Sequence, residues 1–398
     1  MLTNWKMDSK AISQPGLLER VVDKIGKKIL KAPRLILTSG LIVVLIGAYG
    51  LSDLNVEVNI KSFFSQDHAI PKSLTFLDEE MVGSMDYTFR IEGDLKDPQT
   101  LKKMVLLQEY MEQHPKISIS ISIADIIKQM HRTIMDDDPV FETIPDERDK
   151  VNNLFTMYSM SGDPDDFSSL VNYDYTVGLV TVMSKNMSTQ AAEIYVGEVK
   201  KFIEQEINGE MEITTTGMLP VLGDMVDMVI SSSFRSIFAS IIVVSLIAGF
   251  FFRRIGWGLL AVIPLSSAVI LNFGFMGLFN IDLNHVTAVL SSVIIGVGVD
   301  FAIHYISQYR RSVKTVKDPN ILGREVIDEV GYPIVLDALS NMAFAALLFS
   351  QFLPVRHMGG LMVFAMLSTS VGTLTLLASV MELLRRNKKI YNRLIRGN

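Results

Sequence analysis

The sequence contains no cysteine. Disulfide frameworks, thiolate metal sites and cysteine nucleophiles are therefore excluded. It also lacks a nucleotide-binding loop, the ligand spacing of a metal centre and a nucleophile elbow, so the pattern does not favour an enzyme. We predict no resident metal and no cofactor. The energy for any work the protein performs must then come from an ion gradient or a partner.

Basic residues are scarce in one part of the chain. Residues 53–232 hold 32 Asp and Glu against 14 Lys and Arg, whereas the remainder holds 11 against 23. The two parts thus have opposite charge. Because the acidic part offers no basic groove interleaved with aromatic residues, we predict that the protein does not bind nucleic acid.

Long apolar runs are abundant, although charged residues make up 20% of the chain and the mean hydropathy is +0.32. A helix that crosses the hydrocarbon core needs about 20 mostly apolar residues. Six segments meet this criterion: 35–52, 234–252, 257–279, 286–308, 332–352 and 358–384. The sequence therefore predicts a multi-pass α-helical membrane protein with six transmembrane helices and one large soluble insertion.

The Lys and Arg residues indicate an orientation, because basic flanks resist translocation. They gather in the amphipathic segment 1–34, after the second and fourth spans, and in the tail 385–398. With six spans, all of these lie on one side. We predict that both termini are cytoplasmic, that domain 53–232 is extracytoplasmic, and that the protein resides in the cell inner membrane.

The soluble domain alternates strand-like and helix-like periods. Strand patterns occur at 87–93, 175–184 and 211–217, and helical patterns at 101–114 and 191–207, an order typical of βαβ units. Between them, the acidic residues of 136–166 lack the ligand spacing of a calcium loop, and we interpret them as a solvated surface. A further amphipathic helix is expected at the membrane interface near 319–331, ending where Gly331 and Pro333 begin the fifth span.

The fourth span carries titratable residues inside its apolar run. Gly296, Asp300 and His304 recur every four residues and so share one helix face. An aspartate at a helix centre costs about 3 kcal/mol on insertion scales, so such a residue usually faces a protein interior or a water path. Gly296 and Gly298 would allow a neighbouring helix to approach closely. Asp300 and His304, one turn apart, have the chemistry of a proton relay.

The fifth span offers candidate partners on one face, at Asp337, Ser340 and Asn341. We include Asp337 and Asn341 in the predicted relay with Asp300 and His304. Alternatively, these residues have a structural role. They would then form hydrogen bonds that hold the helices together, or Asp300 and His304 would form a static buried pair.

These residues resemble those of the RND superfamily, in particular the branch of MMPL and hopanoid-exporter-like proteins. The similarity is carried by KAPRLIL before the first span, FFRRIGWGLLAVIPL at the third, LNHVTAVLSSVIIGVGVDFAIHYISQYRR in the fourth, and LLFSQFLPVRHMGGLMVF across the last two. The fourth-span segment is the most specific. Phe301 stands where many relatives have tyrosine, and most relatives have twelve spans where six are found here.

The resemblance implies an extracytoplasmic α+β porter-like domain of ferredoxin-like βαβ modules, and export of lipids or other hydrophobic molecules driven by protons, with Asp300 as the proton carrier. It also implies a parallel repeat of two six-helix halves. We therefore expect the chain to form a homodimer or to pair with a second half within membrane lipids. Two other functions stay open, a sterol- or lipid-sensing patched-like receptor and a secretion accessory resembling SecD or SecF.

Overall fold

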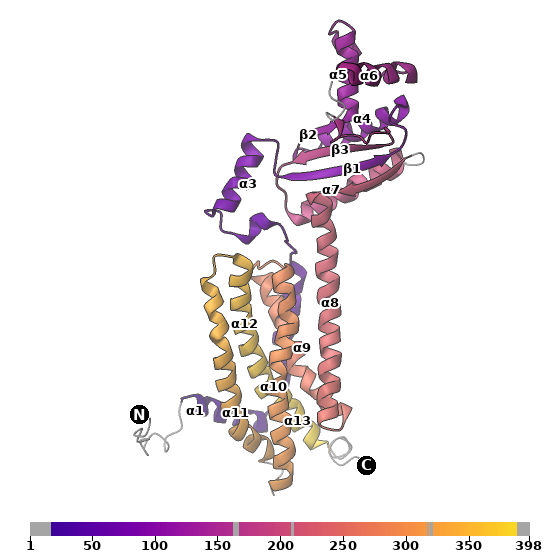
Figure 1. Ribbon diagram of the computed structural model, residues 1–398. Helices are drawn as coiled ribbons and strands as arrows, with labels where there is room; N and C mark the ends of the chain where they lie inside the picture. Colours follow the sequence, from indigo (N-terminus) through magenta and orange to yellow (C-terminus); the bar gives the residue numbers. More distant parts are fainter. Residues whose placement is uncertain (1–16, 162–166, 208–210, 317, 319–320, 388–398) are drawn as a thin grey trace, which may run out of the picture. The chain divides into compact units, whose positions relative to one another are not determined.

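The computed structural model describes residues 17–161, 167–207, 211–316, 318 and 321–387. Residues 1–16 of the predicted basic segment, 319–320 of the predicted interfacial helix and 388–398 of the predicted tail lie outside this part. The chain forms two compact units, one from Met1–Val56 with Val229–Asn398 and the other from Glu57–Met228. The first unit is helical, and the second combines helices with a small sheet (Figure 1).

Six helical segments in the described part of the chain are long and apolar enough to cross a membrane, as the sequence predicts. They include α2 (Pro33–Gly50), α8 (Met218–Phe251), α9 (Ile255–Leu278), α10 (His285–Thr315), α11 (Leu322–Asn341) and α12 (Leu353–Gly372). The fifth span continues as the 3₁₀ segment η6 (Met342–Phe349), and the sixth as the π segment η7 (Thr373–Leu377) and α13 (Ala378–Arg386). A multi-pass membrane protein is therefore confirmed.

The predicted break at Gly331 and Pro333 is wrong. Helix α11 runs through both residues, with Pro333 inside it. A proline within a membrane helix is tolerated where neighbouring helices and local adjustments satisfy the freed backbone groups. The segment expected near 319–331 is therefore continuous with the fifth span in one helix, and its place at the membrane interface stays a prediction.

Close contacts between backbones pack α2 against α9. A methyl group built at Gly274 would overlap the carbonyl oxygen of Gly47, and one built at Gly277 would overlap that of Gly50. Small residues that allow such approach are the usual basis of helix association in lipid. Buried on α9, the Asn272 side chain donates a hydrogen bond of 2.9 Å to the Leu361 carbonyl of α12. These contacts place α9 at the centre of the membrane unit.

The N-terminal helix α1 (Leu17–Lys31) packs on α11. Arg324 lies 3.1 Å from the carboxylate of Asp23, and a methyl group at Gly26 would meet Ile327 at 3.4 Å. The nearby Lys27 holds the pKa of Asp23 below its usual range, with Arg324 adding to the effect. Helix α1 thus packs on the fifth span through this ion pair and the small residue Gly26.

The second unit contains a four-stranded antiparallel sheet in the order β2-β3-β1-β4. The strands are β1 (Met85–Glu92), β2 (Ile117–Ser122), β3 (Val177–Ser184) and β4 (Glu212–Thr216). Helix α4 (Pro98–Glu112) connects β1 to β2, and α7 (Thr189–Phe202) precedes β4. Since β1 and β2 are both antiparallel to β3, they run parallel to each other with β3 between them.

The core of this unit lies between one face of the sheet and its helices. Tyr87, Phe89 and Ile91 of β1 are almost fully buried, as are Leu101 and Met104 of α4. Burial raises the pKa of Tyr87 well above its usual value. The alternation of buried and half-exposed positions in β1 and β3 follows the two-residue period of a strand.

The second unit also contains η2 (Ile60–Phe63), α3 (Ala69–Glu80), α5 (Ile123–Ile134), η3 (Pro139–Phe141), α6 (Arg148–Ser161) and the π segment η5 (Ile203–Ile207). Ser122 caps α5 through its side chain, and Asp125 completes the capping box. The acidic stretch 136–166, interpreted above as a solvated surface, includes the 14 residues of α6, while its residues 162–166 lie outside the described part.

Candidate functional site

Helix α10 positions the candidate proton-carrying residues. Its N-terminus is fixed by Asn284, whose side chain accepts hydrogen bonds of 3.0 Å from the backbone of Val286 and Thr287. The helix has 31 residues and is about 46 Å long at a rise of about 1.5 Å per residue. Asp300 lies midway along it. A carboxyl group at this position falls within the span however the helix ends are adjusted.

One face of α10 is packed inside the unit and the other is open. Phe301, Ala302 and Tyr305 are almost fully buried. On the other side, Gly296, Asp300 and His304 form a line of exposed positions, which we call the polar stripe. Within the described part of the chain, the side chains of Asp300 and His304 form no hydrogen bond and no ion pair.

The sequence predicts that Asp300 faces an interior formed by this chain, whereas in the structure Asp300 is exposed. The difference follows from the helix period, because the aromatic and aliphatic residues one position away already occupy the packed face. Gly298 lies on that packed face, where a methyl group would meet Leu265 and Thr369 at 2.8 Å. Gly296 has no neighbouring atom within 4 Å of the position that a methyl group would take.

The predicted partners on α11 interact with each other. The Asn341 amide donates to the carboxylate of Asp337 at 3.2 Å and to its backbone carbonyl at 3.1 Å. Asp337 is exposed and Asn341 half-buried. Within the described residues no hydrogen bond joins this pair to Asp300 or His304. The two parts of the predicted relay are therefore separate in this state of the chain.

The helix changes its form directly after the Asp337–Asn341 pair. The eight residues of η6 are a 3₁₀ helix. Runs of this helix longer than about four residues are uncommon, and within a longer helix they often mark a hinge. The sixth span contains a π segment, η7, another feature that is frequent at functional sites.

A buried ionic group lies near the end of the sixth span. Glu382 is 2% exposed and accepts hydrogen bonds from Arg385 at 2.7 and 2.9 Å and from Arg386 at 3.0 Å. The spacing of one acidic residue three and four positions before two arginines was a signal for this cluster. The described residues contain no group of three or more His, Asp or Glu side chains that could hold a metal ion.

Comparison with known proteins identifies the family of the chain. The model of the MMPL family matches residues 92–395, so the chain belongs to the MMPL family of RND-type membrane proteins. Membrane protein MJ1562 of Methanocaldococcus jannaschii is 22% identical over 384 residues, covering 93% of this chain and 96% of that protein.

A solved structure shares the fold. The hedgehog release protein Disp of the water bear Hypsibius dujardini superimposes with a TM-score of 0.58 at 14% identity, over 92% of this chain. The match covers 49% of Disp, so this chain spans about half the length of that protein. Membership of the family supports a role in membrane transport, and the likeness to Disp shows the fold.

Proposed function

We propose that this protein is half of an RND-type transporter that uses the proton motive force to export or relocate lipids or other hydrophobic molecules. The observation that carries the proposal is the polar stripe of α10, where Asp300 and His304 are exposed midway along a membrane span. A carboxylate there costs about 3 kcal/mol when ionised, so its presence at this position points to a functional role.

The working cycle begins with protonation of Asp300 from the extracytoplasmic side. Once Asp300 is neutral, the polar stripe favours a different packing of α10 against its neighbours. Release of the proton toward the cytoplasm restores the charge and the original packing. Each proton crossing 100 mV supplies about 2.3 kcal/mol, enough to shift a two-state equilibrium by tens-fold. His304 provides the second titratable group one turn away, and Asp337 with Asn341 receives the proton in the alternative state.

The 3₁₀ segment η6 supplies a conformational change of suitable size. A 3₁₀ helix rises about 2.0 Å per residue and an α-helix about 1.5 Å. Conversion of the eight residues of η6 would therefore shorten the fifth span by about 4 Å. This shift would move the Asp337–Asn341 pair along α10.

A second copy of the chain, or a second half, is proposed to cover the polar stripe. Charged groups in membrane spans face the interior of a bundle or a water-filled path, and no such path is formed by the described residues around Asp300 and His304. By contrast, the exposed face of α2 carries Leu41, Leu45 and Ile46, which suit lipid contact.

The second unit is proposed to be an extracytoplasmic porter-like domain with one ferredoxin-like module. Its strand order and the β1-α4-β2 and β3-α7-β4 connections support this. The acidic balance of residues 53–232 and the basic flanks of the spans support placement outside the cytoplasm, with both termini inside and the protein in the cell inner membrane.

Proton flux tests the proposed function. Purified protein in liposomes, with a trapped pH dye and candidate lipids, is compared with Asp300→Asn and with Asp328→Asn, which removes an exposed carboxylate from the start of the fifth span. We expect flux to be lost only in Asp300→Asn. Equal flux in both variants contradicts the relay, and no flux from folded wild type contradicts transport and favours a lipid-sensing receptor.

The pairing is tested with introduced cysteines, which are unique because the chain has none. Gly296→Cys is expected to form a disulfide-linked dimer in lipid, whereas Leu45→Cys on the apolar face of α2 is not. Linkage at position 45 with none at 296 would contradict a second copy at the polar stripe.

A further inference from the structure

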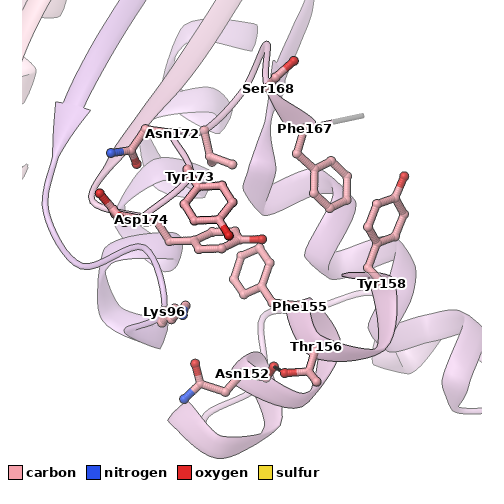
Figure 2. Close-up of a pocket in the computed structure, with 12 residues that line it drawn as sticks. Lys96, Asn152, Phe155, Thr156, Tyr158, Phe167, Ser168, Asn172, Tyr173 and Asp174 are labelled. Atoms are coloured by element: carbon pink, nitrogen blue, oxygen red, sulfur yellow. Dashed lines mark hydrogen bonds between the residues drawn. The ribbon is translucent and has the colours of Figure 1, made fainter. Parts of the chain in front are cut away.

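A cavity of about 760 Å³ lies in the second unit (Figure 2). It is formed between α6 and the segment 167–175 that precedes β3. Five of its lining residues are aromatic: Phe155, Tyr158, Phe167, Tyr173 and Tyr175. Small-molecule sites usually have volumes of about 300–1,000 Å³ and are lined mainly by apolar and aromatic groups with a few polar ones. The cavity has the size of a ligand site, and its lining is divided about equally between aromatic residues and polar or charged ones.

Two ring contacts fix much of the aromatic surface. Phe155 and Tyr175 have ring centroids 4.5 Å apart, and Tyr158 stacks on Phe167 at 4.0 Å. The fifth ring, Tyr173, is 92% exposed and therefore contributes little to packing. An exposed tyrosine at an aromatic cavity offers contact area to a ligand but adds little to the stability of the fold.

The backbone holds the Tyr175 ring in place at some conformational cost. Tyr175 has a φ of 56°, which is unusual for a bulky residue. Its N–H donates to the Asn172 carbonyl at 3.1 Å and its carbonyl accepts from the Leu95 N–H at 3.0 Å. The Asn172 side chain in turn accepts from the backbone of Thr176 and Val177 at 2.8 and 2.9 Å. A strained residue fixed by this many bonds is typical of a functional position.

One end of the cavity is charged. The ammonium group of Lys96 lies 4.8 Å from the centre of the Tyr175 ring, is half-buried, and forms no ion pair within the described residues. The carboxylate of Asp174 is exposed at the same end, and Tyr158 and Phe167 lie at the other end (Figure 2). The cavity is therefore amphipathic, with a charged end and an aromatic end.

We infer that this cavity binds an anionic amphiphile, with its apolar body against the aromatic rings and its carboxylate or phosphate head on Lys96. A cationic head is disfavoured because Lys96 already occupies the Tyr175 face that a cation would seek. The inference rests on the proposed function, since it specifies the charge of the hydrophobic cargo and a place where the soluble unit holds it.

Photo-crosslinking tests this site. Full-length protein in phosphatidylcholine nanodiscs is labelled with a diazirine derivative of palmitate in mildly alkaline buffer, and the labelled peptides are mapped by mass spectrometry. We expect label within residues 152–175. Competition should be strong with palmitate, weaker with hexadecanol and weakest with hexadecyltrimethylammonium, three compounds with one chain length and different head charge.

Three variants separate the charge from the rings. Lys96→Gln should weaken palmitate binding by about tenfold and leave hexadecanol unchanged, because one charged hydrogen bond is lost. Tyr173→Ala should weaken both by about threefold. Asp174→Asn is the matched control, which removes a charge of opposite sign at the same end and should leave palmitate binding unchanged or tighter.

Two outcomes would overturn the inference. One is labelling confined to the membrane helices, and the other is loss of binding in Asp174→Asn with Lys96→Gln unaffected, which would indicate a cationic ligand. Because labelling requires no proton gradient, Asp300→Asn should label like the wild type. Failure of proton flux and failure of the cavity to bind are thereby distinguished.

Discussion

Replacement of Gly274 by alanine should destabilise the membrane unit. The added methyl group would lie well inside van der Waals contact, normally about 3.5–4.0 Å, of the Gly47 carbonyl oxygen on α2. A backbone carbonyl inside a helix cannot rotate away, so α2 and α9 must separate. Overpacking of this kind costs about 1–3 kcal/mol. Removal of a helix glycine returns about 1 kcal/mol, so we expect a net loss of up to about 2 kcal/mol.

This change is measured by heating the purified protein in one detergent. The readout is the fraction of protein that remains monodisperse after each temperature. Gly360→Ala is the control, because its methyl group would meet the Leu348 side chain at an ordinary 3.5 Å. It should unfold at the wild-type temperature or slightly above. If Gly274→Ala is as stable as Gly360→Ala, the close approach of α2 and α9 is refuted.

Two further predictions concern charged pairs. Glu382→Gln should lower stability by about 2–3 kcal/mol, because Arg385 is only 13% exposed and loses a charged partner. Arg386 is 47% exposed, so Arg386→Gln should cost less than about 1 kcal/mol in the same melting assay. Lys102, 2.5 Å from Asp146, lowers the pKa of that carboxyl. The contribution of this pair to stability should therefore be present above the ordinary carboxyl pKa and be lost as the pH falls through the lowered value, and carboxyl NMR should show the titration returning to normal in Lys102→Met.

The membrane helices were predictable because hydropathy over about 20 residues decides a span almost alone. The helix α11 was the exception. Gly331 and Pro333 end a helix in water, but packing in the fifth span maintains it through both. In the soluble unit, strands β1, β3 and β4 were predicted to within two residues at each end. Strand β2 was not, since Ile and Ser alternate in ISISIS without the turn residues that would separate it from α5.

The residues of the candidate site were identifiable from the sequence, but their surroundings were not. A four-residue spacing places Gly296, Asp300 and His304 on one face of a helix whatever covers that face. Which face is packed depends on residues of α9 and α12 far away in the sequence. The aromatic cavity was also missed, because Lys96, Phe155 and Tyr175 come from three separate segments that only the fold of the second unit brings together.

Asp300→Leu should weaken self-association if a second copy covers the polar stripe. Each exposed carboxylate costs about 3 kcal/mol in a span, so two copies carry about 6 kcal/mol that pairing can relieve. Recovery of even a quarter of this energy corresponds to about a tenfold change in Kd. Dilution of labelled protein in lipid, followed by energy transfer between copies, measures that Kd, with Leu45→Ala on the apolar face of α2 as the control. A dimer as stable in Asp300→Leu as in the wild type would show that the polar stripe is covered by something other than a second copy of this chain.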